Sequence, residues 1–141
     1  MVVNQTKLVP TADGFRDEAA GKQLLKWGRC RWDTLQPTDV DALIEWRGTG
    51  FTIIEVKRVG AKDNRGQEWA FTRAVDAMTR GGCLSIYIKS LHNIPAPNDI
   101  YLDDLLVKKY YIRSEWKSPE HPTTTYDLCD YFQRNELKLN L

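Results

Sequence analysis

Two acidic residues and a lysine form the pattern in this chain that is best suited to chemistry. Asp41 lies in the segment 38–44, and a single valine separates Glu55 from Lys57 in the segment 53–57. Two carboxylates suit Mg²⁺, which prefers oxygen ligands and keeps several waters and substrate phosphate oxygens. Such an ion polarises a phosphoryl oxygen and generates hydroxide, while an ammonium orients water and offsets charge in the transition state. The pattern therefore predicts metal-assisted hydrolysis of a phosphate ester.

Two predicted strands would bring these three residues together. Residues two apart in a strand share a face, so Glu55 and Lys57 point the same way. Their strand is apolar on both sides at its middle, which predicts a central strand covered on both faces. The turn at 47–50 fits a hairpin with the preceding strand. In the register that we predict, Asp41 faces Lys57 and Leu43 faces Glu55, so the functional side chains converge on one side of the sheet.

Asp39 is a second candidate for the metal ligand on the first of these strands. Asp39 and Asp41 lie on the same side of their strand because they are two residues apart. Only Asp41 faces Lys57 in the predicted register, whereas Asp39 faces Val59 beyond the acid-x-lysine pattern. We therefore predict that Asp41 is the ligand, and a two-residue slip of the hairpin would exchange the two aspartates.

Local patterns predict an α/β fold with a mixed sheet. Asp13 is a suitable N-cap and Gly28 a suitable stop for a first helix with one apolar stripe. The predicted elements are, in order, a helix over 14–27, strands over 30–35, 40–46 and 51–58, a helix over 67–80, a strand over 83–89, a connection over 91–104, a strand over 105–113 and a helix over 125–137.

Composition limits the classes of protein that fit. The chain has 141 residues, 42% of them hydrophobic and 28% charged, which suits one globular domain. A formal net charge of +1 means that any nucleic-acid surface must be a local cluster. Three distant cysteines, Cys30, Cys83 and Cys129, predict reduced thiols in a cytosolic protein. No segment is apolar enough to predict a membrane span, and no P-loop, G-x-S-x-G or dinucleotide-binding glycine pattern is present.

Asp41 followed by Glu55-Val56-Lys57, with a helix and a strand before them, resembles the PD-(D/E)XK nuclease superfamily. This superfamily includes restriction enzymes, Holliday-junction resolvases and RecB-type nuclease domains. Its restriction-endonuclease-like αβββαβ core, with a central mixed sheet, matches the predicted order over 13–90. The segment 91–141 would then add a C-terminal strand and helix to a single nuclease-like domain over 1–141.

The resemblance implies a Mg²⁺-dependent deoxyribonuclease, for which Mn²⁺ is a possible substitute ion. Asp41, Glu55 and the carbonyl of Val56 would hold the metal, and Lys57 would position or activate the attacking water. Family members often carry a further acid on the first helix, and Glu18 is the matching position. Glu18 is equally well explained as a first-turn acid that interacts favourably with the helix dipole.

DNA is the partner that the resemblance implies, and several polar side chains are candidates for contacting it. The RecB-type branch carries a glutamine on the helix after the lysine, which Gln67 matches, although a plain helix residue explains it as well. The run from Arg58 to Arg65 flanks the catalytic lysine, and a solvated surface is the alternative interpretation. The predicted nucleic-acid contacts are Arg58, Lys62, Arg65, Gln67 and Arg73.

A second surface near the C-terminal half could stack bases. Tyr110, Tyr111 and Trp116 lie among Lys108, Lys109, Arg113 and Lys117, an aromatic-basic mixture that also suits core packing.

Two alternatives to catalysis stay open on the sequence. One is a nuclease fold that binds nucleic acid or a protein partner without cutting. The other is a solvated strand end on which Glu55 and Lys57 form an ordinary ion pair. A homodimer is compatible with the sequence. The size and character of the chain are typical of small phage accessory proteins, which predicts a cytoplasmic location in a bacterial or phage-infected cell.

Overall fold

The structure is a computed structural model that describes residues 8–11, 14–17, 26, 28–29 and 31–141. Contacts divide the chain into two units, Met1–Pro37 and Thr38–Leu141. A single domain over the whole chain stays a prediction, whereas the α/β class with a mixed sheet is confirmed in the second unit. Among the described residues, no helix has the length and apolar character needed to cross a membrane.

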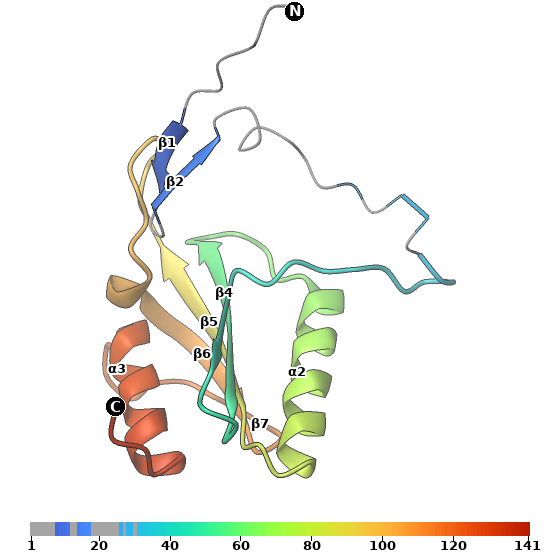
Figure 1. Cartoon of the computed structure of the whole chain (residues 1–141), viewed down its shortest axis with the longest axis vertical. Coiled ribbons are helices and arrows are strands. Elements are labelled where there is room, and N and C mark those ends of the chain that lie inside the picture. The colour runs from blue at the N-terminus through green and yellow to red at the C-terminus, as the bar shows by residue number, and fades with distance from the viewer. Residues whose placement is uncertain (1–7, 12–13, 18–25, 27, 30) are drawn as a thin grey trace, which may run out of the picture. The chain divides into compact units, whose positions relative to one another are not determined.

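A five-stranded mixed sheet in the order β3-β4-β5-β6-β7 forms the centre of the second unit (Figure 1). The β4–β5 pair is parallel and is connected through helix α2, and the other three pairs are antiparallel. A parallel neighbour requires such a crossover, and here it brings β5 beside the acid-x-lysine strand. The strands and the crossover helix are β3 (Ala42–Glu45), β4 (Phe51–Arg58), α2 (Arg65–Arg80), β5 (Ile86–His92), β6 (Leu106–Ile112) and β7 (Glu115–Lys117).

Helices cover the two faces of this sheet (Figure 1). On one face, Phe71 and Val75 of α2 pack with Ile53 of β4 and with two tyrosines of β5 and β6. On the other face, Ile54 packs with β5, β6 and the C-terminal helices α3 (Thr125–Tyr131) and η2 (Phe132–Glu136). Because consecutive residues of β4 are buried on opposite faces, the prediction of a central strand covered on both sides is confirmed.

Strand β3 pairs with β4 in a register two residues away from the predicted one. Leu43 lies opposite Ile53, and the ladder begins at Ala42 opposite Ile54. The predictions that Leu43 faces Glu55 and that Asp41 faces Lys57 are therefore wrong. This is the two-residue slip that would exchange Asp39 and Asp41, but both aspartates precede β3, and it is the Asp41 carboxylate that bonds to β4. The turn is the cause, since Trp46 and Gly50 close the hairpin by a hydrogen bond from the Trp46 N–H to the Gly50 carbonyl, at 2.9 Å. A two-residue shift preserves which side chains share a face.

The predicted helix over 14–27 is wrong at its start. Strand β1 (Leu8–Thr11) pairs antiparallel with β2 (Gly14–Asp17), and Thr11 lies opposite Gly14. Asp13-Gly14 is a strong hairpin signal as well as a plausible helix start, and strand pairing overrides the helical pattern at 14–17. The remainder of the predicted helix, apart from Lys26, lies outside the described residues.

The predicted strand over 30–35 is also wrong over 31–35. Trp32 and Leu35 form only an isolated antiparallel bridge, and Asp33 between them has a φ of 55°. A tight turn at this position leaves no length for an extended strand. Cys30 lies outside the described residues.

The helices and strands that are predicted after β4 form at those places, but some of their first or last residues differ from the predicted ones. Strand β5 begins at Ile86, three residues after the predicted start at Cys83, and β7 is an additional short strand. Its hairpin with β6 turns at Arg113 and Ser114, which have φ values of 49° and 62°. Such turns favour glycine or asparagine, so this dipeptide carries no hairpin signal in the sequence.

We expect Gly50→Ala to destabilise the second unit, because Gly50 is buried against the backbone. An added Cβ would lie 2.1 Å from the Leu84 carbonyl oxygen. Overpacking against backbone lowers the free energy of unfolding by about 3 kcal/mol, the upper end for added methyl groups. Gly66→Ala in α2 is the control, since its Cβ meets only Asn64 Oδ1 at 3.4 Å. Equal urea midpoints for the two variants would contradict the packing at Gly50.

Candidate active site

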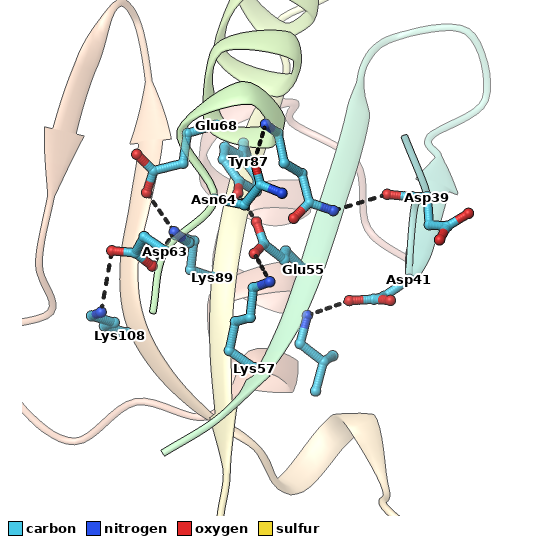
Figure 2. Close-up of polar contacts among 12 residues, drawn as sticks. Asp39, Asp41, Glu55, Lys57, Asp63, Asn64, Glu68, Tyr87, Lys89 and Lys108 are labelled. Carbon is cyan, nitrogen blue, oxygen red and sulfur yellow. Dashed lines mark hydrogen bonds and ion pairs between the residues drawn. The ribbon is translucent and has the colours of Figure 1, made fainter. Parts of the chain in front are cut away.

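Glu55 and Lys57 lie on the face of β4 that is covered by α2, as their spacing predicts (Figure 2). The Glu55 side chain is 1% exposed and the Lys57 side chain is 26% exposed. Lys57 Nζ lies 3.1 Å from Glu55 Oε1. A buried carboxylate on a central strand is costly unless it is paired or binds an ion, so the lysine stabilises its charge.

Tyr87 holds the other oxygen of Glu55. The Tyr87 hydroxyl donates a hydrogen bond to Glu55 Oε2 from the neighbouring parallel strand β5 (Figure 2). Tyr87 is fully buried, and its ring packs edge-on against Phe71 at 5.1 Å and Trp116 at 5.5 Å between centroids. Burial, and then the hydrogen bond to Glu55, raise the pKa of Tyr87 far above its usual value, so the hydroxyl stays a donor. No sequence pattern indicated this residue.

Glu55 Oε1 is a buried acceptor for which the described residues provide no hydrogen-bond donor. Lys57 Nζ is close enough for an ion pair with Oε1, but the two atoms do not meet hydrogen-bond geometry. Buried polar atoms in proteins are almost always hydrogen-bonded, so an exception calls for an explanation. A carboxylate oxygen that is held in place and faces an ammonium without a hydrogen bond is also chemically suited to a hard cation.

Asp41 reaches the same stretch of β4 by its side chain. Asp41 Oδ2 accepts a hydrogen bond from the Val56 N–H at 2.7 Å, just past the end of the β3–β4 ladder (Figure 2). The carboxylate thus takes the position of a backbone partner at this edge. Because the N–H and C=O of one strand residue point to the same neighbour, the Val56 carbonyl is directed to this edge too. Asp41 therefore lies beside the residue that follows Glu55 on β4.

Asp39 has a different role from Asp41. Its backbone carbonyl accepts a hydrogen bond from Gln67 Nε2 at 3.1 Å, and its carboxylate points away from Glu55 (Figure 2). The Gln67 N–H also donates to the N-cap Asn64 Oδ1 at 3.1 Å. Gln67 therefore ties the first turn of α2 to the segment before β3, which positions the chain that carries Asp41.

A second charged cluster lies on the same sheet face, centred on Lys89. Lys89 is 1% exposed and is the partner of Glu55 in the β4–β5 ladder. Its ammonium donates to Asp63 Oδ1 at 2.5 Å and to Glu68 Oε1. Lys108 lies 3.5 Å from Asp63, and Lys109 lies 3.2 Å from Glu68. The cluster joins β5, β6, the loop after β4 and the first turn of α2.

These contacts lower the pKa values of the two acids in the cluster and raise that of Lys89. The hydrogen bond from Lys89 lowers the pKa of Asp63. Burial of Glu68 opposes a lower pKa, but hydrogen bonds from Lys89 and Lys109 outweigh it, so the pKa of Glu68 is lowered. Burial likewise acts to lower the pKa of Lys89, and its bonds to Asp63 and Glu68 reverse the direction, so that pKa is raised.

The predicted nucleic-acid contacts do not all lie on the face of Glu55, because Arg58 alternates with Lys57 along β4. Arg58, Lys62, Arg65 and Arg73 are exposed, and Arg73 lies over the exposed Trp69 ring at 5.7 Å. Their role in binding stays a prediction.

Of the aromatic residues in the second predicted surface, Tyr111 belongs to the core, whereas Trp116 is partly exposed. Tyr111 is nearly buried and donates to Asp76 Oδ2 at 2.8 Å. Trp116 is partly exposed, with Lys109 Nζ 4.2 Å from its ring centroid.

Glu18 lies outside the described residues, so its predicted place beside the metal stays a prediction. Within the described part of the chain, no three Asp, Glu, His or Cys side chains gather as a metal site. The ligand set of Asp41, Glu55 and the Val56 carbonyl also stays a prediction.

Comparisons with known proteins assign no family to this chain. No family model, no curated protein and no solved structure matches it.

We expect the free energy of unfolding to fall less steeply with decreasing pH in Lys89→Met than in the wild type. Because the pKa values of Asp63 and Glu68 are lowered on folding, their contribution is complete above about pH 4.5 and is lost as pH falls through the folded values. Because the pKa of Lys89 is raised on folding, its contribution to the free energy of unfolding is complete until pH rises above about 10.5.

Urea unfolding between pH 3 and pH 7 measures this effect. At pH 7 Lys89→Met should lower the free energy of unfolding by about 3 kcal/mol, because it leaves two carboxylates short of a buried partner. Below pH 4.5 the variant should lose less stability than the wild type. Lys62→Met, at an exposed lysine, is the control. If the free energy of unfolding of Lys89→Met falls below pH 4.5 as steeply as that of the control, the pairing of Lys89 with Asp63 and Glu68 is refuted.

Proposed function

We propose that this protein is a Mg²⁺-dependent nuclease that hydrolyses phosphodiester bonds of DNA. The observation that carries the proposal concerns the Oε1 atom of Glu55. Glu55 Oε1 is buried, lacks a hydrogen bond and adjoins Lys57, while the Asp41 carboxylate bonds to the next residue of the same strand. An ordinary surface ion pair does not bury an acceptor in this way.

The arrangement of the elements supports a restriction-endonuclease-like core in part. A β3–β4 hairpin followed by α2 and a parallel β5 supplies the last four elements of an αβββαβ order. The first helix and strand of that order have no counterpart among the described residues, where β1 and β2 precede β3. The proposal therefore depends on the site more than on the fold.

Asp41, Glu55 and the Val56 carbonyl would hold the ion, with Mn²⁺ as a substitute for Mg²⁺. When bound, the metal would supply charge stabilisation at a phosphoryl oxygen and a lower pKa for a bound water. Lys57 is partly exposed, so its ammonium can donate hydrogen bonds to the attacking water and to a phosphate oxygen while the Glu55 charge holds it in place. Exposed Arg58 ends β4, exposed Lys62 lies in the loop after it, and both would contact the DNA backbone.

We expect Lys57→Ala to abolish cleavage and to keep metal binding, because the lysine acts on water and phosphate. Asp41→Asn should lose both, since an amide is a poor ligand for Mg²⁺. Cleavage of linear, nicked and branched DNA is measured with Mg²⁺ or Mn²⁺, and binding is measured as a rise in the melting temperature with either ion. Lys138→Ala, at an exposed lysine near the C-terminus, is the control.

The outcomes separate the proposal from its alternatives. Wild-type cleavage by Lys57→Ala would show that the lysine is structural. DNA binding by the wild type without cleavage of any substrate, in either ion, would identify a nuclease fold that serves only in binding.

We expect Asp41→Ala to reduce cleavage at least tenfold more than Asp39→Ala, a difference of ~1.4 kcal/mol in the barrier. The Asp41 carboxylate lies at β4, whereas Asp39 contributes its backbone carbonyl, which alanine retains. Rates at saturating Mg²⁺ provide the measurement. A larger loss in Asp39→Ala would make Asp39 the ligand, and equal losses would indicate that both aspartates bind metal.

A further inference from the structure

We propose that Tyr87 determines the metal selectivity of this site by restricting Glu55 to a single ligating oxygen. The inference rests on the proposed function, because it takes the Glu55 carboxylate as a metal ligand. It assigns a specific task to the buried hydroxyl of Tyr87.

The two oxygens of Glu55 have different surroundings. Oε2 accepts the hydrogen bond of the Tyr87 hydroxyl, and Oε1 has no hydrogen bond. Lys57 Nζ lies 3.1 Å from Oε1, so the ammonium occupies part of the space around that oxygen as well. A cation that approaches Glu55 therefore finds one partly open oxygen rather than a symmetric carboxylate.

Tyr87 has little freedom to release Oε2. Its ring is fully buried, with Phe71 on one side and Trp116 on another, both in edge-on contact. Its strand β5 is an interior strand, paired with β4 and with β6. Rotation of the carboxylate to present both oxygens to a metal would leave this hydroxyl buried without a partner, which is unfavourable.

A one-oxygen carboxylate distinguishes between divalent cations. Mg²⁺ takes six ligands in near-octahedral geometry and uses carboxylates through single oxygens. Ca²⁺ takes six to eight ligands and often binds a carboxylate through both oxygens. The Tyr87–Glu55 hydrogen bond therefore favours Mg²⁺ and Mn²⁺ over Ca²⁺ at this site, and its removal should allow two-oxygen binding.

Tyr87→Phe tests this role because it removes the hydroxyl and keeps the ring between Phe71 and Trp116. The matched control is Tyr111→Phe on the neighbouring strand β6. Tyr111 also donates to a carboxylate on the same sheet face, Asp76 at 2.8 Å, and also packs against Trp116. Both variants lose one hydroxyl group, but only one of the two bonds involves the proposed ligand.

Calorimetric titration with Mg²⁺, Mn²⁺ and Ca²⁺, in the absence of DNA, gives the affinities. In the wild type we expect Mn²⁺ to bind at least tenfold more tightly than Ca²⁺. In Tyr87→Phe the ratio of Ca²⁺ to Mg²⁺ affinity should rise at least tenfold, while Tyr111→Phe keeps the wild-type ratio. Thermal melts without metal confirm that both variants are folded.

Each outcome distinguishes this inference from the proposed function. If the wild type binds none of the three ions, or if Glu55→Gln binds them as tightly, the proposed function fails. If the wild type binds metal through Glu55 but the affinity ratio of Tyr87→Phe equals that of Tyr111→Phe, only the role of Tyr87 is refuted. Wild-type binding of Ca²⁺ as tight as Mn²⁺ would also refute it, whether or not the Tyr87 variant folds.

Discussion

The burial of the Glu55 carboxylate in the middle of strand β4 is the constraint on which this sheet face depends. A carboxylate that is 1% exposed needs partners, and the structure provides Lys57 from its own strand and Tyr87 from the next. Replacing such an arrangement by apolar residues often stabilises a protein, so buried charge is weak evidence for a stability role. Among the described residues Glu55 Oε1 has no hydrogen bond, and the metal-binding role that we propose would explain it.

The parallel pairing of β4 and β5 has a second consequence on this face. It sets Lys89 beside Glu55, and Lys89 must then be neutralised by other acids. Asp63 and Glu68 provide that charge from the loop after β4 and from α2, so the same contacts fix the start of the helix. One buried carboxylate and one buried ammonium on adjacent strands thus organise the elements around the candidate site.

Much of the site could be predicted because it depends on local spacing. Side chains two apart in a strand share a face, so Glu55 and Lys57 had to lie together once β4 formed. The hairpin register was predicted two residues away, and Asp41, which precedes the ladder, reaches the Val56 N–H between them through its side chain. The helix expected from residue 14 failed where the Asp13-Gly14 dipeptide supports a hairpin equally well.

The sequence by itself determined the α/β class, the central strand and the acid-x-lysine pair, since each follows from periodicity within one segment. Only the tertiary structure decided that Tyr87 holds Glu55, that Lys89 pairs with Asp63 and Glu68, and that Asp41 binds the Val56 N–H. These contacts join segments up to 32 residues apart. Their partners are selected by strand order and register, which arise from packing of the whole sheet and leave no periodic signal in the chain.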